Sequence, residues 1–164
     1  RNYLEINFLE DLKKTSNFSE KYSVSLVNPV DFQLNKFFYK NVGKHHRWVD
    51  RLVWDNFKWM SYLENESVHT YILKLNKDLV GYFELIEDKP NKSSEIAYFG
   101  ILNEYIGKKF GGYLLSEAIK TCFKLTSNRV WVHTCTLDHE NALNNYLKRG
   151  MEIFKEETIQ LNSN

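Results

Sequence analysis

The chain has 164 residues, of which 43% are hydrophobic and 15% aromatic, and it carries 22 basic and 21 acidic side chains. This length suits a single domain, residues 1–164, with a buried core, and is short for two domains. A net charge of +1 favours neither nucleic acid nor a membrane surface as a partner. Any anion that binds must therefore be held by local charges.

Hydropathy and the number of cysteines indicate the cellular compartment in which the protein works. No apolar run approaches the ~18 to 20 residues of a membrane span, and the opening RNYLEINFLEDLKK lacks the apolar segment of a signal peptide. The chain begins at Arg1 rather than Met, which leaves room for a missing leader. Cys122 and Cys135 fall in an expected helix and an expected strand, which suits reduced thiols. We expect a soluble, cytoplasmic protein.

The first half of the chain predicts four strands and two helices. Strands are expected at 3–8, 22–27, 68–75 and 79–86, and helices at 30–41 and 55–63. Pro29 lies where the first turn of a helix accepts proline, and Asp55 is a candidate N-cap. Asn76 to Asp78 is a good hairpin turn between the last two of these strands.

The second half alternates strands with helices. After a turn at 88–94, we expect a strand at 95–102, a helix at 113–125, a strand at 129–136, a helix at 141–148 ended by Gly150, and a strand at 151–159. The helical crossover between the strands at 95–102 and 129–136 predicts that these two strands run parallel. Ligands usually bind at the carboxyl ends of such strands.

The stretch NEYIGKKFGGYLLSEA, residues 103–118, places glycines and lysines before the helix expected at 113–125. A helix N-terminus offers unpaired N–H groups and partial positive charge, so phosphate binding is the natural hypothesis. The stretch matches neither a Walker A loop nor the G-x-G-x-x-G fingerprint, because its glycines stand at 107, 111 and 112. Alternatively, the glycines only permit close helix-to-sheet packing, and the lysines are solvated.

Taken with the residues that follow, this loop resembles the GNAT superfamily of acyl-CoA-dependent N-acyltransferases. The resemblance covers about 80–157 and joins EIAYFGIL, the loop with its helix, RVWVHTCTL and DHENALNNYLKRGMEIF in the right order. ALNNYLKRGM resembles the family's Ala-x-x-x-Tyr-x-x-x-Gly-Phe ending. The resemblance implies an α/β (α+β) GNAT-like fold with a mostly antiparallel mixed sheet, a splayed parallel strand pair and flanking helices.

The resemblance also implies acetyl-CoA as cofactor. The family's loop pattern, Gln/Arg-x-x-Gly-x-Gly/Ala, matches 106–111 but departs at Ile106 and Lys109. The loop backbone would bind the pyrophosphate, and the pantetheine arm would pair with free backbone groups of 99–102 as an added strand does. The residues so assigned to coenzyme A are Phe99, Gly100, Ile101, Leu102, Ile106, Gly107, Lys108, Lys109, Phe110, Gly111, Gly112, Tyr113, His139, Asn141 and Tyr146.

Acyl transfer to an amine needs a neutral nucleophile, an oxyanion stabiliser and a proton for the leaving thiolate. An alkylamine with a pKa near ~10 must first lose its proton, and a phenol near ~10 is a suitable donor to the thiolate. The resemblance assigns Tyr146 as that acid. It assigns Glu95 as the base, with His133, Glu84 and a water chain as alternatives. A core tyrosine and an exposed glutamate are the purely structural interpretations.

The aromatic stretch WVDRLVWDNFKW lies where the family's first helices close over the acceptor. It suggests a pocket with aromatic walls, although an aromatic core with arginines pointing outward explains the same residues. The candidate acceptor contacts are Trp54, Tyr82, Glu84 and His133. In HTCTLDH, the residues His133, Cys135 and His139 lack a second cluster that would complete a zinc site, so no metal is expected.

Two functions remain open at this point. The first is an N-acetyltransferase that transfers acetyl from acetyl-CoA to the primary amine of a small acceptor by direct attack. The second is a non-catalytic acyl-CoA-binding or sensing protein, which the departures at Ile106 and Lys109 favour and the retained Tyr146 opposes. The expected partner is a small-molecule amine rather than nucleic acid or membrane. Dimers that pair through the last strand are common in the superfamily, so a homodimer is also considered.

Overall fold

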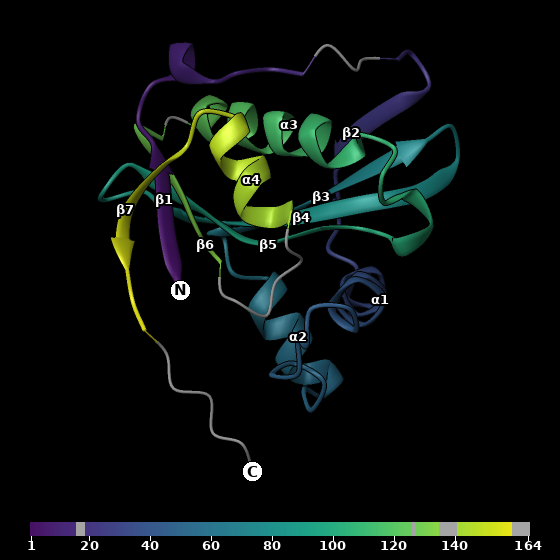
Figure 1. Ribbon diagram of the computed structural model, residues 1–164. Coiled ribbons are helices and arrows are strands. Elements are labelled where there is room, and N and C mark those ends of the chain that lie inside the picture. Colours follow the sequence, from purple (N-terminus) through teal and green to yellow (C-terminus); the bar gives the residue numbers. More distant parts are fainter. Residues whose placement is uncertain (16–18, 126, 135–140, 159–164) are drawn as a thin grey trace.

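The computed structural model describes residues 1–15, 19–125, 127–134 and 141–158. Its strands are β1 (Asn2–Ile6), β2 (Tyr22–Leu26), β3 (Val68–Leu75), β4 (Asp78–Asp88), β5 (Ser93–Ile101), β6 (Arg129–Thr134) and β7 (Glu152–Glu156). Its helices are α1 (Phe32–Gly43), α2 (Asn56–Leu63), α3 (Phe110–Lys124) and α4 (Asn141–Lys148), with short 3-10 turns η1 (Leu9–Asp11) and η2 (Asn103–Tyr105). The seven strands form one mixed sheet, with α3 and α4 on one face and α1 and α2 on the other (Figure 1).

The alternation of side chains along β4 explains why the sheet carries buried apolar residues on both of its faces. Phe83 and Leu85 point to the face covered by α3, where they join the larger apolar cluster. Tyr82 points to the opposite face and packs with Phe38 of α1. Because successive strand residues face opposite sides, a single strand supplies both layers. Tyr82 and Glu84 therefore share the face opposite to that of Phe83.

Capping residues set the starts of α1 and α2. Asp31 accepts hydrogen bonds from the backbone N–H groups of Gln33 and Leu34, so α1 begins two residues later than the apolar pattern predicted. Asp55 Oδ1 accepts from the N–H of Lys58 at 2.8 Å, which confirms it as the N-cap of α2. Each such cap contributes about 1 kcal/mol.

The predicted parallel strand pair is confirmed and it splays. β5 and β6 are in parallel register only at Ser93–Arg129, Ser94–Val130 and Glu95–Trp131. Beyond Glu95, β5 continues to Ile101, and among the described residues it pairs there only with β4 on its other side. Within the described part of the chain, one edge of β5 therefore has no strand partner over most of its length.

A bulge in β5 sets the direction of the side chains beside this splay. Tyr98 lies opposite Glu84, whereas Ile96 lies opposite Leu85, so Ala97 is an extra residue. The bulge places Glu95 and Tyr98 on the same face of the sheet, the face that α1 and α2 cover. Without it, residues three apart would point to opposite faces.

The order of strands at one end of the sheet was not predicted. β1 lies between β6 and β7 and is antiparallel to both, and β7 forms the edge. Figure 1 shows the first strand beside the last two. Among the described residues, no helix is both long enough and apolar enough to cross a membrane.

Candidate active site

A cavity of about 830 Å³ opens where β5 and β6 part. Its walls come from β5, the start of α3, α4 and the segment 46–51 between α1 and α2. The predicted site residues that line it are Glu95, Phe99, Gly100, Ile101, Ile106, Gly107, Lys109, Gly111, Gly112, His133, Asn141 and Tyr146. The structure thus brings both proposed catalytic residues and most of the proposed cofactor contacts to one cavity.

Several predicted cofactor contacts lie elsewhere. Phe110 and Tyr113 are buried against Tyr22 in the core beneath α3. Leu102 is buried, and its N–H donates to the carbonyl of Val80 at 2.8 Å, so that group is not free to pair with a ligand. Lys108 does not line the cavity, and its ammonium lies 5.6 Å from the ring of Tyr105. His139 falls outside the described residues.

Helix α3 begins three residues earlier than predicted, so Gly111 and Gly112 belong to its first turn. The N-cap is Lys109, whose φ of 68° lies in the left-handed region that glycine adopts most easily. Lys109 replaces the first glycine of the family pattern. It nevertheless keeps the backbone conformation that a glycine would adopt there.

The two glycines of that first turn differ in what surrounds them. A Cβ on Gly112 would lie 2.8 Å from Thr15 Cγ2 and 2.9 Å from Arg149 Nη1, so a larger residue there would force these side chains to shift. A Cβ on Gly111 would meet nothing closer than Asn145 Nδ2 at 3.6 Å, an ordinary contact. The packing interpretation therefore explains Gly112 and leaves Gly111, which lines the cavity, unexplained.

Asn145, which the sequence analysis did not single out, ties α4 to α3. Its Nδ2 donates to the carbonyl of Gly111 at 3.1 Å. The next residue, Tyr146, is 8% exposed and lines the cavity. The contact through Asn145 fixes α4 against the first turn of α3 and so places Tyr146 relative to that turn.

Glu95 and His133 face each other across the splay. Glu95 Oε1 lies 3.6 Å from His133 Nδ1, within ion-pair range when the histidine is protonated. Burial raises the pKa of Glu95 above its ordinary value. A carboxylate with a raised pKa is a stronger base, which suits proton removal from an amine.

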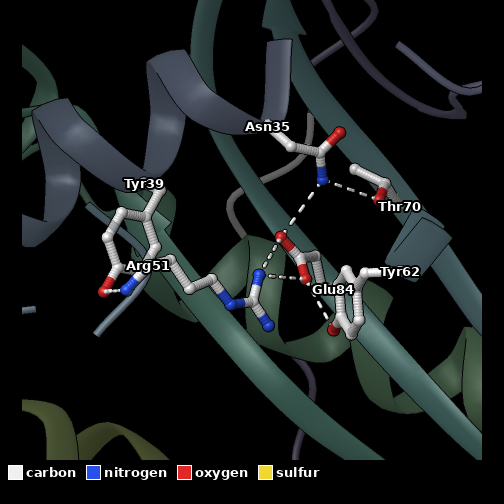
Figure 2. A network of polar contacts seen from close by, with 6 residues as sticks. All are labelled: Asn35, Tyr39, Arg51, Tyr62, Thr70 and Glu84. Carbon is white, nitrogen blue, oxygen red and sulfur yellow. Dashed lines mark hydrogen bonds and ion pairs between the residues drawn. The ribbon is translucent and has the colours of Figure 1, made fainter. Parts of the chain in front are cut away.

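A buried polar network lies on the α1 and α2 side of the cavity (Figure 2). Arg51 Nη1 donates to both oxygens of Glu84, at 3.0 and 3.2 Å, and the two side chains are 6% and 0% exposed. The Tyr62 hydroxyl and Asn35 Nδ2 also donate to Glu84, at 2.9 and 3.1 Å. Burial and the nearby carboxylate raise the pKa of Tyr62, so its phenol keeps the proton that it donates.

The structure does not bring the predicted acceptor contacts Trp54, Tyr82 and Glu84 to the cavity. Glu84 is fully buried and its carboxylate is already paired with Arg51. Tyr82 is fully buried and stacks on Phe38 with ring centroids 4.7 Å apart. The physical reason is that α1 and α2 cover this face of β4, so its side chains become core.

Aromatic rings surround the guanidinium of Arg51, one of the residues that line the cavity. Its Cζ lies 3.9 to 5.9 Å from the ring centroids of Tyr98, Tyr62, Trp54, Trp59 and Tyr39. Although burial alone would lower the pKa of Arg51, the Glu84 charge and nearby phenols raise it, so the guanidinium stays charged. The expectation that arginines of this stretch point outward is wrong for Arg51, which points inward and lines the cavity.

Metal ligation has no support in the described part of the chain. Within it, no group of three or more His, Cys, Asp or Glu side chains is arranged to hold a metal ion. Cys135 and His139, which the sequence analysis considered beside His133, lie outside the described residues.

Several solved structures that are similar to this chain are described as acetyltransferases. A GCN5-related N-acetyltransferase from Sphaerobacter thermophilus has a TM-score of 0.69 and 14% identity over 93% of this chain and 48% of that chain. An aminoglycoside acetyltransferase, meta-AAC0020, from an uncultured soil metagenomic sample, in complex with sisomicin, has a TM-score of 0.68 and 11% identity over 88% and 96%. A Bacillus subtilis acetyltransferase in complex with CoA has a TM-score of 0.62 and 20% identity over 87% and 90%.

At these low sequence identities, the structural similarity establishes a shared fold. A GCN5-related N-acetyltransferase from Kribbella flavida is also similar, with a TM-score of 0.63 and 15% identity, and this chain spans 93% of its own length and 53% of that protein. Among curated proteins, none is significantly similar in sequence. The sequence profile of the acetyltransferase (GNAT) family, however, matches residues 32–151, which is most of the chain. The chain therefore belongs to the acetyltransferase (GNAT) family.

Proposed function

We propose that this chain is an N-acetyltransferase that transfers acetyl from acetyl-CoA to the primary amine of a small acceptor by direct attack. The observation that carries the proposal is one cavity that joins the start of α3 to Tyr146 and Glu95. The Bacillus subtilis neighbour is described in complex with CoA, and the soil aminoglycoside acetyltransferase in complex with sisomicin, an aminoglycoside. Both descriptions support a CoA-dependent reaction on a small amine.

The residues present fit coenzyme A. Gly111 lines the cavity with no packing need for a glycine, so its missing Cβ suits the close approach of a phosphate. Lys109 adds a positive charge in the same wall. At Phe99 and Gly100, β5 pairs among the described residues only with β4, so its other edge would offer backbone groups to the amides of the pantetheine arm.

Bound acetyl-CoA would supply the activated acetyl group. Glu95 accepts the proton that the ammonium form of the acceptor must lose before it can act as a nucleophile. The amine nitrogen would bond to the acetyl carbon as the bond from that carbon to sulfur breaks, and Tyr146 would donate its phenolic proton to the departing thiolate. Tyr146 is 8% and Glu95 19% exposed, so both side chains lie at the cavity wall with little contact with bulk water.

The alternative of a non-catalytic sensing protein rested on the departures at Ile106 and Lys109. Lys109 has a left-handed φ of 68°, a conformation that glycine adopts easily, so the missing glycine at this position does not prevent the turn before α3. This observation weakens the case for a disabled cofactor site and favours the catalytic proposal.

The test is acetyl-CoA binding by titration calorimetry, followed by thiol release with a panel of amines. We expect one-to-one binding in the micromolar range, about −8 kcal/mol. Tyr146→Phe should lower turnover about 10-fold or more while cofactor affinity stays the same. No binding heat together with no thermal shift would refute the proposal, and an unchanged turnover in Tyr146→Phe would refute the role of Tyr146.

A further inference from the structure

Arg51 has an unused hydrogen-bonding edge. Its side chain is 6% exposed, and only Nη1 among its guanidinium nitrogens donates to a described residue, namely Glu84. Figure 2 shows Nε and Nη2 on the side away from Glu84. Neither nitrogen is among the fully buried side-chain nitrogens and oxygens that lack a hydrogen-bond partner, so each keeps some exposed surface, and Arg51 is one of the residues that line the cavity.

The shape of this edge selects the ligand group. Nε and Nη2 form one side of the planar guanidinium fork, which matches the two oxygens of a carboxylate. The rings of Tyr98 and Tyr62, with centroids 3.9 and 4.3 Å from Cζ, flank the guanidinium and restrict its movement. A ligand must therefore approach along the edge of the fork, where bidentate pairing is available.

The charge of the cavity agrees with an anionic acceptor. Its described lining carries five basic side chains, Arg1, Arg47, Arg51, Lys109 and Lys148, against the two acidic side chains Asp50 and Glu95. Lys109 and its neighbours serve the cofactor end, whereas Arg47 and Arg51 lie in the segment between α1 and α2. A polycationic acceptor would meet like charge on that side.

The unused edge lies near the proposed chemistry. Arg51 packs against the ring of Tyr98, and the bulge at Ala97 puts Tyr98 on the same face as Glu95. Their partners on β4, Glu84 and Ile86, are two residues apart, which corresponds to roughly 7 Å along the strand. One small molecule can therefore place an amine near Glu95 and a second group near Arg51.

We propose that Arg51 binds a carboxylate of the acceptor through Nε and Nη2, so that the substrate is an amine that also carries a carboxylate. This inference rests on the proposed acetyltransferase function. It makes Arg51 a specificity-determining residue, with Glu84 as the residue that positions it.

The first test compares matched acceptors in the thiol-release assay. The pairs are 4-(aminomethyl)benzoate with benzylamine, and phenylalanine with phenethylamine. For at least one pair, we expect kcat/KM to be roughly 10-fold or more higher with the carboxylate, as a charged bidentate contact gives. The double variant Arg51→Met/Glu84→Gln should abolish this preference and keep acetyl-CoA affinity, whereas Arg47→Gln, which removes a nearby charge but no fork, should keep most of it.

The second test needs no turnover. The Nε–H resonance of Arg51, identified by its loss in Arg51→Lys, should shift saturably when 4-(aminomethyl)benzoate is added and should not shift with benzylamine. A shift without thiol release would refute the proposed enzyme activity and leave the carboxylate site standing. Thiol release with equal or better use of the plain amines in both pairs, or no shift with the carboxylate, would overturn the inference.

Discussion

Substitution of Glu84 by glutamine tests the buried network most directly. Glu84 is fully buried, and Arg51 beside it is 6% exposed, so the change leaves a buried guanidinium without its counter-charge. Breaking a buried ion pair from one side costs about 3 to 5 kcal/mol. Glutamine keeps the volume but only one acceptor oxygen, so either the bond from Tyr62 to Oε1 or the bond from Asn35 to Oε2 is lost together with the charge.

This cost is a large fraction of the free energy of unfolding of a typical domain, about 5 to 15 kcal/mol. It should be measured by urea unfolding followed by tryptophan fluorescence, comparing midpoints at an unchanged m-value. Glu117→Gln is the matched control, because Glu117 pairs with Lys120 at 2.8 Å on the surface with both side chains about a quarter to a third exposed. That variant should stay within about 0.5 kcal/mol of the parent.

The double variant Arg51→Met/Glu84→Gln completes the cycle. Each single variant leaves one buried charge, whereas the double variant leaves none, so its cost should fall short of the sum of the singles by about 2 kcal/mol or more. A cost below about 1 kcal/mol for Glu84→Gln, or simple additivity of the two changes, would refute the reasoning that the pair is buried and coupled.

Three further predictions concern the cavity. Gly111→Ala should leave stability unchanged or slightly higher but weaken acetyl-CoA binding at least 10-fold by calorimetry, whereas Gly112→Ala should lower stability by about 1 to 3 kcal/mol because its Cβ meets Thr15. Lys109→Gly should raise the free energy of unfolding by about 1 kcal/mol through relief of its left-handed φ of 68°, and equal stability in urea would contradict this. Burial raises the pKa of Glu95 in the folded protein above its value in the unfolded chain. Ionising Glu95 therefore lowers the free energy of unfolding, and this loss is recovered as pH falls through the folded pKa toward the unfolded one. Glu95→Gln should therefore be at least as stable as the parent at pH 8 and should lose any advantage in stability in acid. In the parent, the acidic limb of the pH profile of kcat/KM should lie above pH 4.5, and in the variant this limb should be missing.

Much of the fold follows from local signals in the sequence. Capping by Asp55, the apolar alternation of β3 and the crossover between β5 and β6 were sufficient to predict those elements and the parallel pair. The position of β1 between β6 and β7 was not predictable, because alternation fixes which face of a strand is buried and leaves its neighbours undetermined.

The candidate site likewise contains residues that local sequence patterns predict and residues that they do not. Tyr146, Glu95 and the loop before α3 could be proposed as site residues because the family's motifs hold such residues at fixed spacing along the chain, and the structure places all of them at one cavity. Arg51 was missed because its partner Glu84 is 33 residues away and no pattern links them. Its one sequence signal, an arginine among tryptophans, is typical of both a surface arginine and a buried one.

The buried pair of Arg51 and Glu84 is a poor device for stability, because apolar side chains of similar volume often stabilise a core as well or better. Its position argues for another role. Glu84 holds Nη1 from one side, the Tyr98 ring packs on the guanidinium, and Arg51 lines the cavity that we propose as the site of acyl transfer. A guanidinium fixed in this way binds a carboxylate without first losing rotamer freedom, so the energy of the contact contributes to recognition. The double variant separates the two roles, since it removes the carboxylate preference while removing no net charge from the core.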